Sequence, residues 1–268
     1  MAAPEQAPSS GVASVSKAVS LLRMFTPSAS VLSIRQLADR TGIPRSTVHA
    51  LCATLSAEGL LELVPQAGYR LGPTLLELGG QIVERAGLVE AAEPVMGRLP
   101  RIRGMEAHLG QLVGGWVVYL HHRSFDSMRV PMANWVGLRA PAFLTGCGKA
   151  TLSLLEPKDV EARMRSLSRS EQVRPPDAST LRDELTAARE QGFVVSRTFQ
   201  QDRTSVAAPV VGPDGVPVGG LSVAGPSSLF TPRLTEQAAH DVKEAARQTG
   251  ARLLGERAAY VRARPIRW

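Results

Sequence analysis

The sequence predicts an α+β fold in two domains, and three observations support this prediction. The chain has 268 residues, enough for two domains that each bury a core. Apolar residues follow a helical period over most of the first hundred residues, apart from one short hairpin, whereas strand-like runs begin after Gly104. These runs form two groups with helical segments between them. This order is typical of an antiparallel sheet packed against helices.

The composition is that of a globular protein, with 44% hydrophobic and 21% charged residues. A formal net charge of +7 favours polyanionic partners. Cys52 and Cys147 form neither a zinc-ligand spacing nor a disulfide framework. Residues 1–13 are expected to be a flexible arm without signal-peptide features, and no apolar run is long enough to span a membrane. We therefore expect a cytoplasmic protein that does not contact a membrane.

Three short helices are predicted before residue 60. The first covers residues 14–25, where apolar residues form one stripe. The second starts after Ser33, which has the character of an N-cap, and ends at Thr41-Gly42. The third begins at Pro44 and buries one face, made of Val48, Leu51, Cys52 and Leu55.

A polar face and a hairpin complete this domain. Residues 60–64 and 69–71 read as two strands joined by a turn at residues 65–68. Two short helices, a glycine turn and a following hairpin are the parts of a winged helix-turn-helix. We expect the third helix to enter the major groove, the wing to contact phosphate, and the DNA-binding residues to be Ser33, Arg45, Ser46, Thr47, His49 and Arg70. The alternative is a helical hairpin inside an enzyme, with Arg45 and His49 merely solvated.

The segment LADRTGIPRSTVHALCATLSAEGLLE…GYRLGPTLLELG resembles the DNA-binding domain of the IclR family of bacterial transcription regulators. The resemblance extends over about residues 14–255. It implies a homodimer or a dimer of dimers, helped by the first helix, that binds a palindromic double-stranded operator. Ala50 departs from the family pattern, which usually has Arg there, so one basic contact is missing.

The expected domains are a DNA-binding domain at 14–72, a linker helix at 73–87, an effector-binding domain at 88–256 and a basic tail at 257–268. The linker, weakened at Gly79-Gly80, is either a lever or a plain spacer. The tail either touches phosphates or an acidic neighbouring surface, or is a frayed end.

The effector-binding domain should begin with a helix over 88–103, interrupted at Pro94 and Pro100. Strands are predicted at 105–113, 116–121, 128–132, 193–199, 205–211 and 216–224, and helices at 152–155, 160–167, 181–191 and 232–256. We expect an antiparallel sheet covered on one side and curved around a cavity. Small-molecule-sensing GAF-like and PAS-like modules are built in this way.

Residues 145–150 open a helix with small residues, whose free backbone N–H groups favour an anionic ligand such as a carboxylate. By the resemblance, Gly146 and Cys147 match the family's backbone-donor pair, Ser205 stands where many members have Cys, and Ser222 matches the first Ser of an LSVSGP strand. Ala224 replaces the second Ser of that strand. Ser196 and Arg197 replace acidic residues. The implied effector is a small organic acid, larger or more aromatic than glyoxylate, whereas close helix packing is the other explanation of Gly146 and Cys147.

An enzymatic reading rests on Cys147, His108, His121, His122 and Asp126, which are ingredients of nucleophilic catalysis. The two adjacent histidines on a strand point to opposite faces, and His108 is better explained as a sheet residue. The sequence has no phosphate loop, dinucleotide fingerprint or HExxH pattern, and no cofactor or metal is expected. We therefore predict a ligand-responsive repressor. The alternatives are a sensor that acts through protein contacts and, less favoured, a Cys-dependent enzyme.

Overall fold

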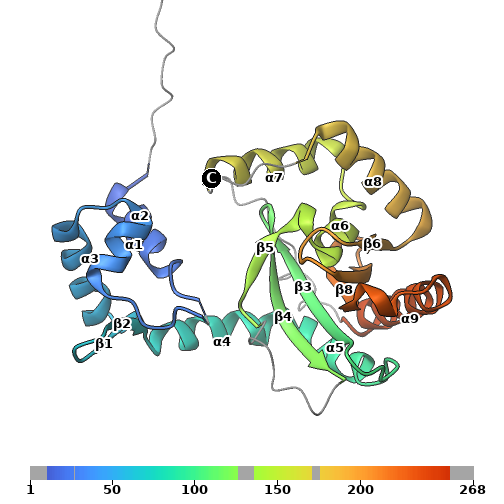
Figure 1. The fold of residues 1–268 in the computed structure, drawn as a ribbon, viewed down its shortest axis with the longest axis horizontal. Coiled ribbons are helices and arrows are strands. Elements are labelled where there is room, and N and C mark those ends of the chain that lie inside the picture. Colours follow the sequence, from blue (N-terminus) through green and yellow to red (C-terminus); the bar gives the residue numbers. More distant parts are fainter. Residues whose placement is uncertain (1–10, 27, 126–135, 171–175, 254–268) are drawn as a thin grey trace, which may run out of the picture. The chain divides into compact units, whose positions relative to one another are not determined.

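The computed structural model describes residues 11–26, 28–125, 136–170 and 176–253 (Figure 1). The chain separates into two compact units, Met1–Ile82 and Val83–Trp268. Within the described residues, no helix has the length and apolarity needed to cross a bilayer.

The first unit packs three helices, α1 (Ala13–Leu22), α2 (Ile34–Thr41) and α3 (Arg45–Ala57). A capping box starts α2, since Ser33 accepts a hydrogen bond from the Gln36 N–H while its own N–H donates to the Gln36 side chain at 2.9 Å. Gly42 ends α2 with a φ of +70°, which favours glycine. Pro44 precedes α3 in an extended conformation, with ψ 138°, so the prediction that the helix begins at this proline is off by one residue.

The wing is fastened to the start of α2. Strands β1 (Leu61–Val64) and β2 (Gly68–Leu71) form the predicted antiparallel hairpin. Leu32 and Tyr69 exchange two backbone hydrogen bonds of 2.9 Å each, which adds a third short segment to this sheet. The wing is therefore anchored to the helical core, which buries Leu21, Leu37, Val48 and Cys52.

Helix α4 (Thr74–Ala86) leads along the chain into the second unit, where α5 covers Leu88–Met96. The helix predicted over 88–103 was expected to be interrupted at Pro94. This is wrong, because Pro94 lies inside α5 and the Gly97 N–H still bonds to the Glu93 carbonyl. One lost hydrogen bond is outweighed by burial of an apolar face made of Leu88, Ala91, Ala92, Val95 and Met96. The predicted continuation to residue 103 is also wrong, since α5 ends at Met96.

The second unit contains a six-stranded sheet in the order β5-β4-β3-β8-β7-β6, with every pair antiparallel. The α+β fold with an antiparallel sheet is thus confirmed. The predicted strand at 128–132 lies outside the described residues, and β6 is shorter than predicted. The strands are β3 (Glu106–Val113), β4 (Trp116–Ser124), β5 (Arg139–Pro141), β6 (Val194–Ser196), β7 (Arg203–Val211) and β8 (Pro217–Pro226).

Alternation along the strands separates the two faces of this sheet. Ala107 and Leu109 of β3 join the core formed with α5 and α9 (Pro232–Arg252). Their neighbour Gly110 lies against Cys147 on the opposite face. That face carries α6 (Gly146–Leu152), and beyond it lie α7 (Pro157–Ser170) and α8 (Ala178–Gln191) (Figure 1).

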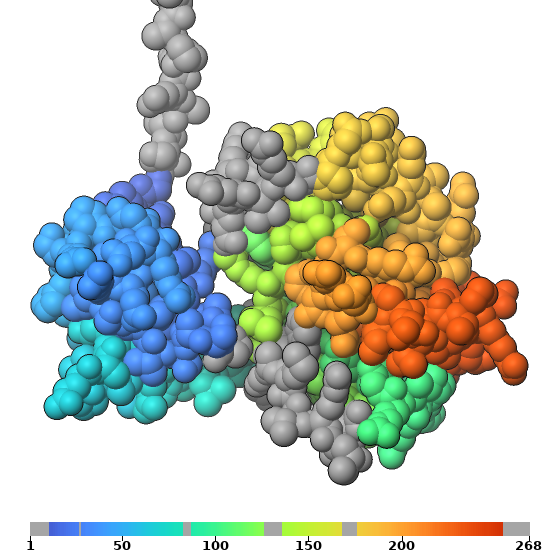
Figure 2. Space-filling model, viewed as in Figure 1, coloured from blue at the N-terminus to red at the C-terminus, as the bar shows by residue number. Residues whose placement is uncertain are grey.

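The expectation of a sheet covered on one side is therefore wrong, because helices cover both faces. Figure 2 shows α8 and α9 on the outer surface of the second unit. Two single turns of 3₁₀-helix, Ala142–Leu144 and Ser227–Leu229, lead into α6 and toward α9.

Helix α6 lies with its backbone directly on its neighbours. A Cβ atom at Gly148 would stand 2.2 Å from the Ala142 carbonyl oxygen, and one at Gly220 would stand 2.4 Å from the Cys147 carbonyl oxygen. Lys149, only 4% exposed, pairs with Glu184 of α8 at 2.7 Å. These contacts fix α6 between the sheet and α8.

Candidate functional site

The DNA-facing candidates lie at the start of α3. Arg45, Ser46 and His49 are exposed, whereas Thr47 is half-buried. Pro44 provides no side-chain hydrogen bond to cap the helix. The first-turn N–H groups and the positive end of the helix dipole therefore add to the charge of Arg45, a combination suited to a phosphate backbone and base edges.

Ser33 and Arg70 are the two remaining DNA-binding candidates, and both are already engaged. Ser33 caps α2, as described above. The Arg70 guanidinium donates to both oxygens of Glu62 across the wing, at 2.9 and 2.8 Å. The hydrogen bond from Arg70 lowers the pKa of the Glu62 carboxyl, so that this acid stays charged beside the candidate phosphate contact.

The second candidate site is a cavity on the α6 face of the sheet, with a volume of about 40 Å³. Four of the residues predicted from the sequence share one face of β6, β7 and β8, and Gly146 meets them from α6. Cys147 is not among the lining residues and lies behind them, with its Sγ 3.3 Å from the Ser222 Oγ. The predicted residues that line the cavity are Gly146, Ser196, Ser205, Ser222 and Ala224.

Sequence reasoning missed the charged part of this cavity. Glu106 of β3 accepts a hydrogen bond from Arg203 of β7 and lies 2.9 Å from His122 Nε2. Burial alone would raise the pKa of the Glu106 carboxyl, but the hydrogen bond with His122 and electrostatic interactions with the surrounding basic side chains, Arg203 among them, outweigh it, so the pKa is lowered. Burial lowers the pKa of His108 to about 4. The cavity therefore holds a charged Glu106–Arg203 pair beside a neutral His108.

Ligand atoms of Glu106, His108 and His122 all lie within 4.8 Å of one another, a spacing that one metal ion would need. The guanidinium of Arg203 contacts the same carboxylate, and a positive charge there opposes a bound cation. The cluster is thus better explained as an ion-pair network. The expectation that the protein binds no metal stays a prediction.

Among the described residues of the enzymatic alternative, Cys147 is not an activated nucleophile. Burial raises the pKa of the Cys147 thiol to about 11, although Ser222 and nearby backbone groups act in the opposite direction. A thiol of this kind is almost fully protonated at neutral pH, and its side chain is 1% exposed. Asp126 lies outside the described residues.

This burial gives a direct prediction for thiol chemistry. At pH 7, neither Cys147 nor Cys52, whose pKa burial also raises to about 11, is expected to react with dithionitrobenzoate while the protein is folded. Both thiols should react on unfolding in denaturant, which gives the reference rate. A Cys52→Ser variant assigns the remaining signal to Cys147. Rapid labelling of Cys147 in that folded variant would contradict the assigned environment and favour a reactive cysteine.

Two protein-family models match the chain. The model described as the C-terminal part of the bacterial transcriptional regulator IclR matches residues 80–251, and the IclR helix-turn-helix domain matches residues 14–65. The HTH-type transcriptional regulator BhcR of Paracoccus denitrificans is 30% identical over 251 residues, covering 90% of this chain and 87% of the relative. The regulator KdgR of Escherichia coli is 28% identical, with 83% and 86% covered.

Solved structures show the same fold. An IclR transcriptional regulator from Silicibacter sp. TM1040 matches with a TM-score of 0.74 and 28% identity, covering 89% of this chain and 95% of that one. An IclR homologue from Microbacterium hydrocarbonoxydans, crystallised with 4-hydroxybenzoate, matches with a TM-score of 0.70 and 23% identity, covering 89% and 98%.

Proposed function

Because the chain belongs to the IclR family of bacterial transcription regulators, we propose that it represses transcription by binding a palindromic operator and that a small organic acid changes this binding. The binding unit would be a homodimer or a dimer of dimers, with half-sites about 34 to 36 Å apart. The observation that carries the proposal is the exposed polar face at the uncapped start of α3, inside a winged helix-turn-helix.

The proposed effector site is the cavity between α6 and the sheet. Hydroxyl groups of Ser205 and Ser222 line it, and Arg203 supplies a cation. A ligand carboxylate would compete with Glu106 for this guanidinium, so binding would exchange an ion pair within the protein for one with the ligand. An effector changes operator affinity only if it binds one conformation of the protein more tightly than another.

The volume of this cavity bears on the size of the acid. About 40 Å³ holds a few water molecules, whereas pockets for drug-sized ligands measure about 300 to 1,000 Å³. An acid of a few heavy atoms suits this conformation. An aromatic acid, by analogy with the 4-hydroxybenzoate complex of the Microbacterium homologue, would require widening. Phe199 and Gln200, which line the cavity from the segment after β6, are the residues we expect to move.

Fluorescence anisotropy with the protein's own upstream intergenic DNA tests the proposal. Binding should resist unrelated competitor DNA and weaken as salt rises, because phosphate contacts release counterions. Candidate acids are then screened for a change in this binding. Affinity no greater than for the competitor, over a panel of neighbouring intergenic fragments, would exclude operator recognition and leave a sensor that acts through protein contacts.

The wing gives a second prediction. Glu62→Gln should tighten operator binding by about two- to fivefold, because it removes a negative charge near phosphate and releases Arg70. Arg70→Gln should weaken binding and reduce its salt dependence. Glu58→Gln, which removes another exposed acid of the same unit, is the matched control and should have the smaller effect. Equal effects of the two Glu substitutions would mean that Arg70 makes no phosphate contact.

A further inference from the structure

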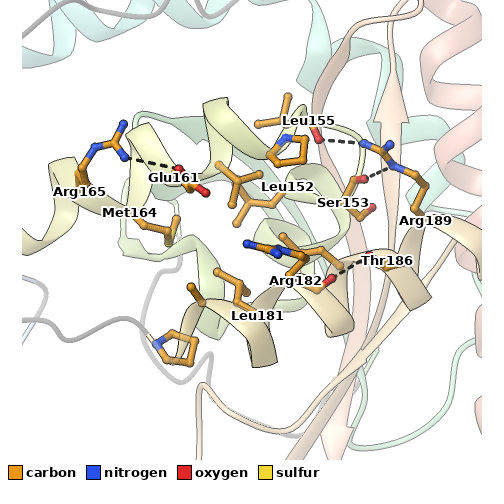
Figure 3. Close-up of a pocket in the computed structure, with 15 residues that line it drawn as sticks. Leu152, Ser153, Leu155, Glu161, Met164, Arg165, Leu181, Arg182, Thr186 and Arg189 are labelled. Atoms are coloured by element: carbon orange, nitrogen blue, oxygen red, sulfur yellow. Dashed lines mark hydrogen bonds and ion pairs between the residues drawn. The ribbon is translucent and has the colours of Figure 1, made fainter.

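A second and larger cavity lies between α7 and α8, over the C-terminal end of α6 (Figure 3). Its volume is about 430 Å³, within the range of small-molecule pockets. Apolar side chains from all three helices form its walls, among them Leu152, Val160, Met164, Leu181 and Leu185. These five side chains belong to one hydrophobic core of the second unit, so the walls of the cavity are part of the folded protein.

This cavity is separate from the proposed effector site, since no described residue lines both. Gly146, at the start of α6, lines the effector cavity, whereas Leu152, at its end, lines the larger one. Arg189 of α8 fixes the end of α6 by donating hydrogen bonds to the carbonyls of Ser153 and Leu155, at 2.6 and 2.8 Å. These bonds hold the segment that follows α6 against α8, beside the larger cavity.

The charge at the cavity is positive. Arg165 pairs with the lining acid Glu161 at 3.6 Å, and Arg189 is used by the carbonyls named above. Arg182 differs, because among the described residues its guanidinium has no hydrogen-bond or ion-pair partner. Figure 3 shows this guanidinium directed from α8 into the space between the helices. A cation beside apolar walls suits a ligand with a carboxylate head and an apolar body.

We propose that this cavity is a second ligand site, which binds a medium-chain aliphatic monocarboxylate with its head on Arg182 and its chain along Leu152 and Met164. An aliphatic chain fits better than an aromatic ring because the described lining residues include no aromatic side chain for stacking. The volume is near the lower end of the range for ligand pockets, which favours a medium rather than a long chain. The site does not depend on operator recognition.

Isothermal titration calorimetry of the full-length protein with octanoate, and with octan-1-ol as its uncharged counterpart, tests the proposal without DNA. Saturable binding of octanoate is expected. Arg182→Gln should weaken octanoate about tenfold, the effect of losing one charge-assisted hydrogen bond, and leave octan-1-ol unchanged. Lys158→Gln removes an exposed cation of α7 that does not line the cavity, and it should bind octanoate as the unchanged protein does.

A second variant fills the cavity from its rim. Thr186 lines the cavity from an exposed position on α8, so Thr186→Trp should abolish binding of both probes while the circular dichroism spectrum is retained. The proposal is overturned if the unchanged protein shows no saturable octanoate binding. It is also overturned if the Arg182 and Thr186 variants bind octanoate as tightly as the unchanged protein does. Loss of octanoate binding in Ser205→Ala, but not in Arg182→Gln, places the ligand in the effector cavity. That result overturns the second site and leaves the proposed function standing.

Discussion

Arg45→Ala is expected to weaken operator binding by about 1 to 3 kcal/mol, or roughly five- to 150-fold. Arg45 is exposed at the first position of α3, where no side chain caps the first-turn N–H groups and the positive end of the helix dipole adds to its charge. The substitution removes the charge without removing buried surface. Anisotropy titrations on the operator and on single-base variants measure the effect.

The pattern over sequences distinguishes two roles of Arg45. Loss of discrimination at one base pair indicates a contact with a base edge, whereas equal weakening on all sequences indicates a phosphate contact. Arg35→Ala is the matched control, because Arg35 is an exposed arginine of α2 that pairs with Asp39 at 3.8 Å. Unchanged affinity in Arg45→Ala would favour the sensor that acts through protein contacts.

Gly148→Ala is expected to destabilise the second unit by about 3 kcal/mol, at the upper end of the cost of overpacking. All three atoms nearest to the added Cβ belong to the backbone of Ala142, with the carbonyl oxygen at 2.2 Å, so no flexible side chain can make room. Thermal unfolding followed by calorimetry measures the change. The transition of the second unit should move to lower temperature.

Gly80→Ala provides the matched control for this prediction. Gly80 lies within α4, and a Cβ there would meet no atom within 4 Å. Alanine is the better helix former, so this substitution should stabilise the protein by about 0.5 to 1 kcal/mol. Equal transition temperatures for Gly148→Ala and the unchanged protein would show that α6 can move away from Ala142.

Local patterns were sufficient to predict most elements. The N-cap at Ser33, the glycine turn at Gly42 and the two strands predicted at 105–113 and 116–121 each depend on residues within a few positions of one another. The predicted elements were wrong where tertiary packing, and not the local sequence, determines the structure. Pro94 lies inside a helix because the buried face of α5 outweighs one lost hydrogen bond, and no local pattern contains that information.

The proposed effector cavity could likewise be predicted only in part. Ser205 and Ser222 were found through motif resemblance, but the Glu106–Arg203 pair joins strands far apart in the sequence. Its members come together only because β8 lies between β3 and β7, and a single sequence does not state this strand order. The cavity between α7 and α8 was missed for a related reason. In the sequence, the residues of its walls look like the apolar faces of ordinary packed helices, and only the structure shows that α7 and α8 leave a space between them.

The strand order also has a consequence for synthesis on the ribosome. Strand β3 ends at Val113, yet its partner β8 begins only at Pro217, so the centre of the sheet closes late. Until then one edge of β3 has unpaired backbone groups, and edges of this kind are prone to wrong pairing with other chains. In the helix-turn-helix unit, which ends by Ile82, the described strands β1 and β2 pair with each other and with Leu32, so their pairing needs no distant segment. A nascent chain can therefore hold a folded helix-turn-helix unit before the sheet of the second unit exists.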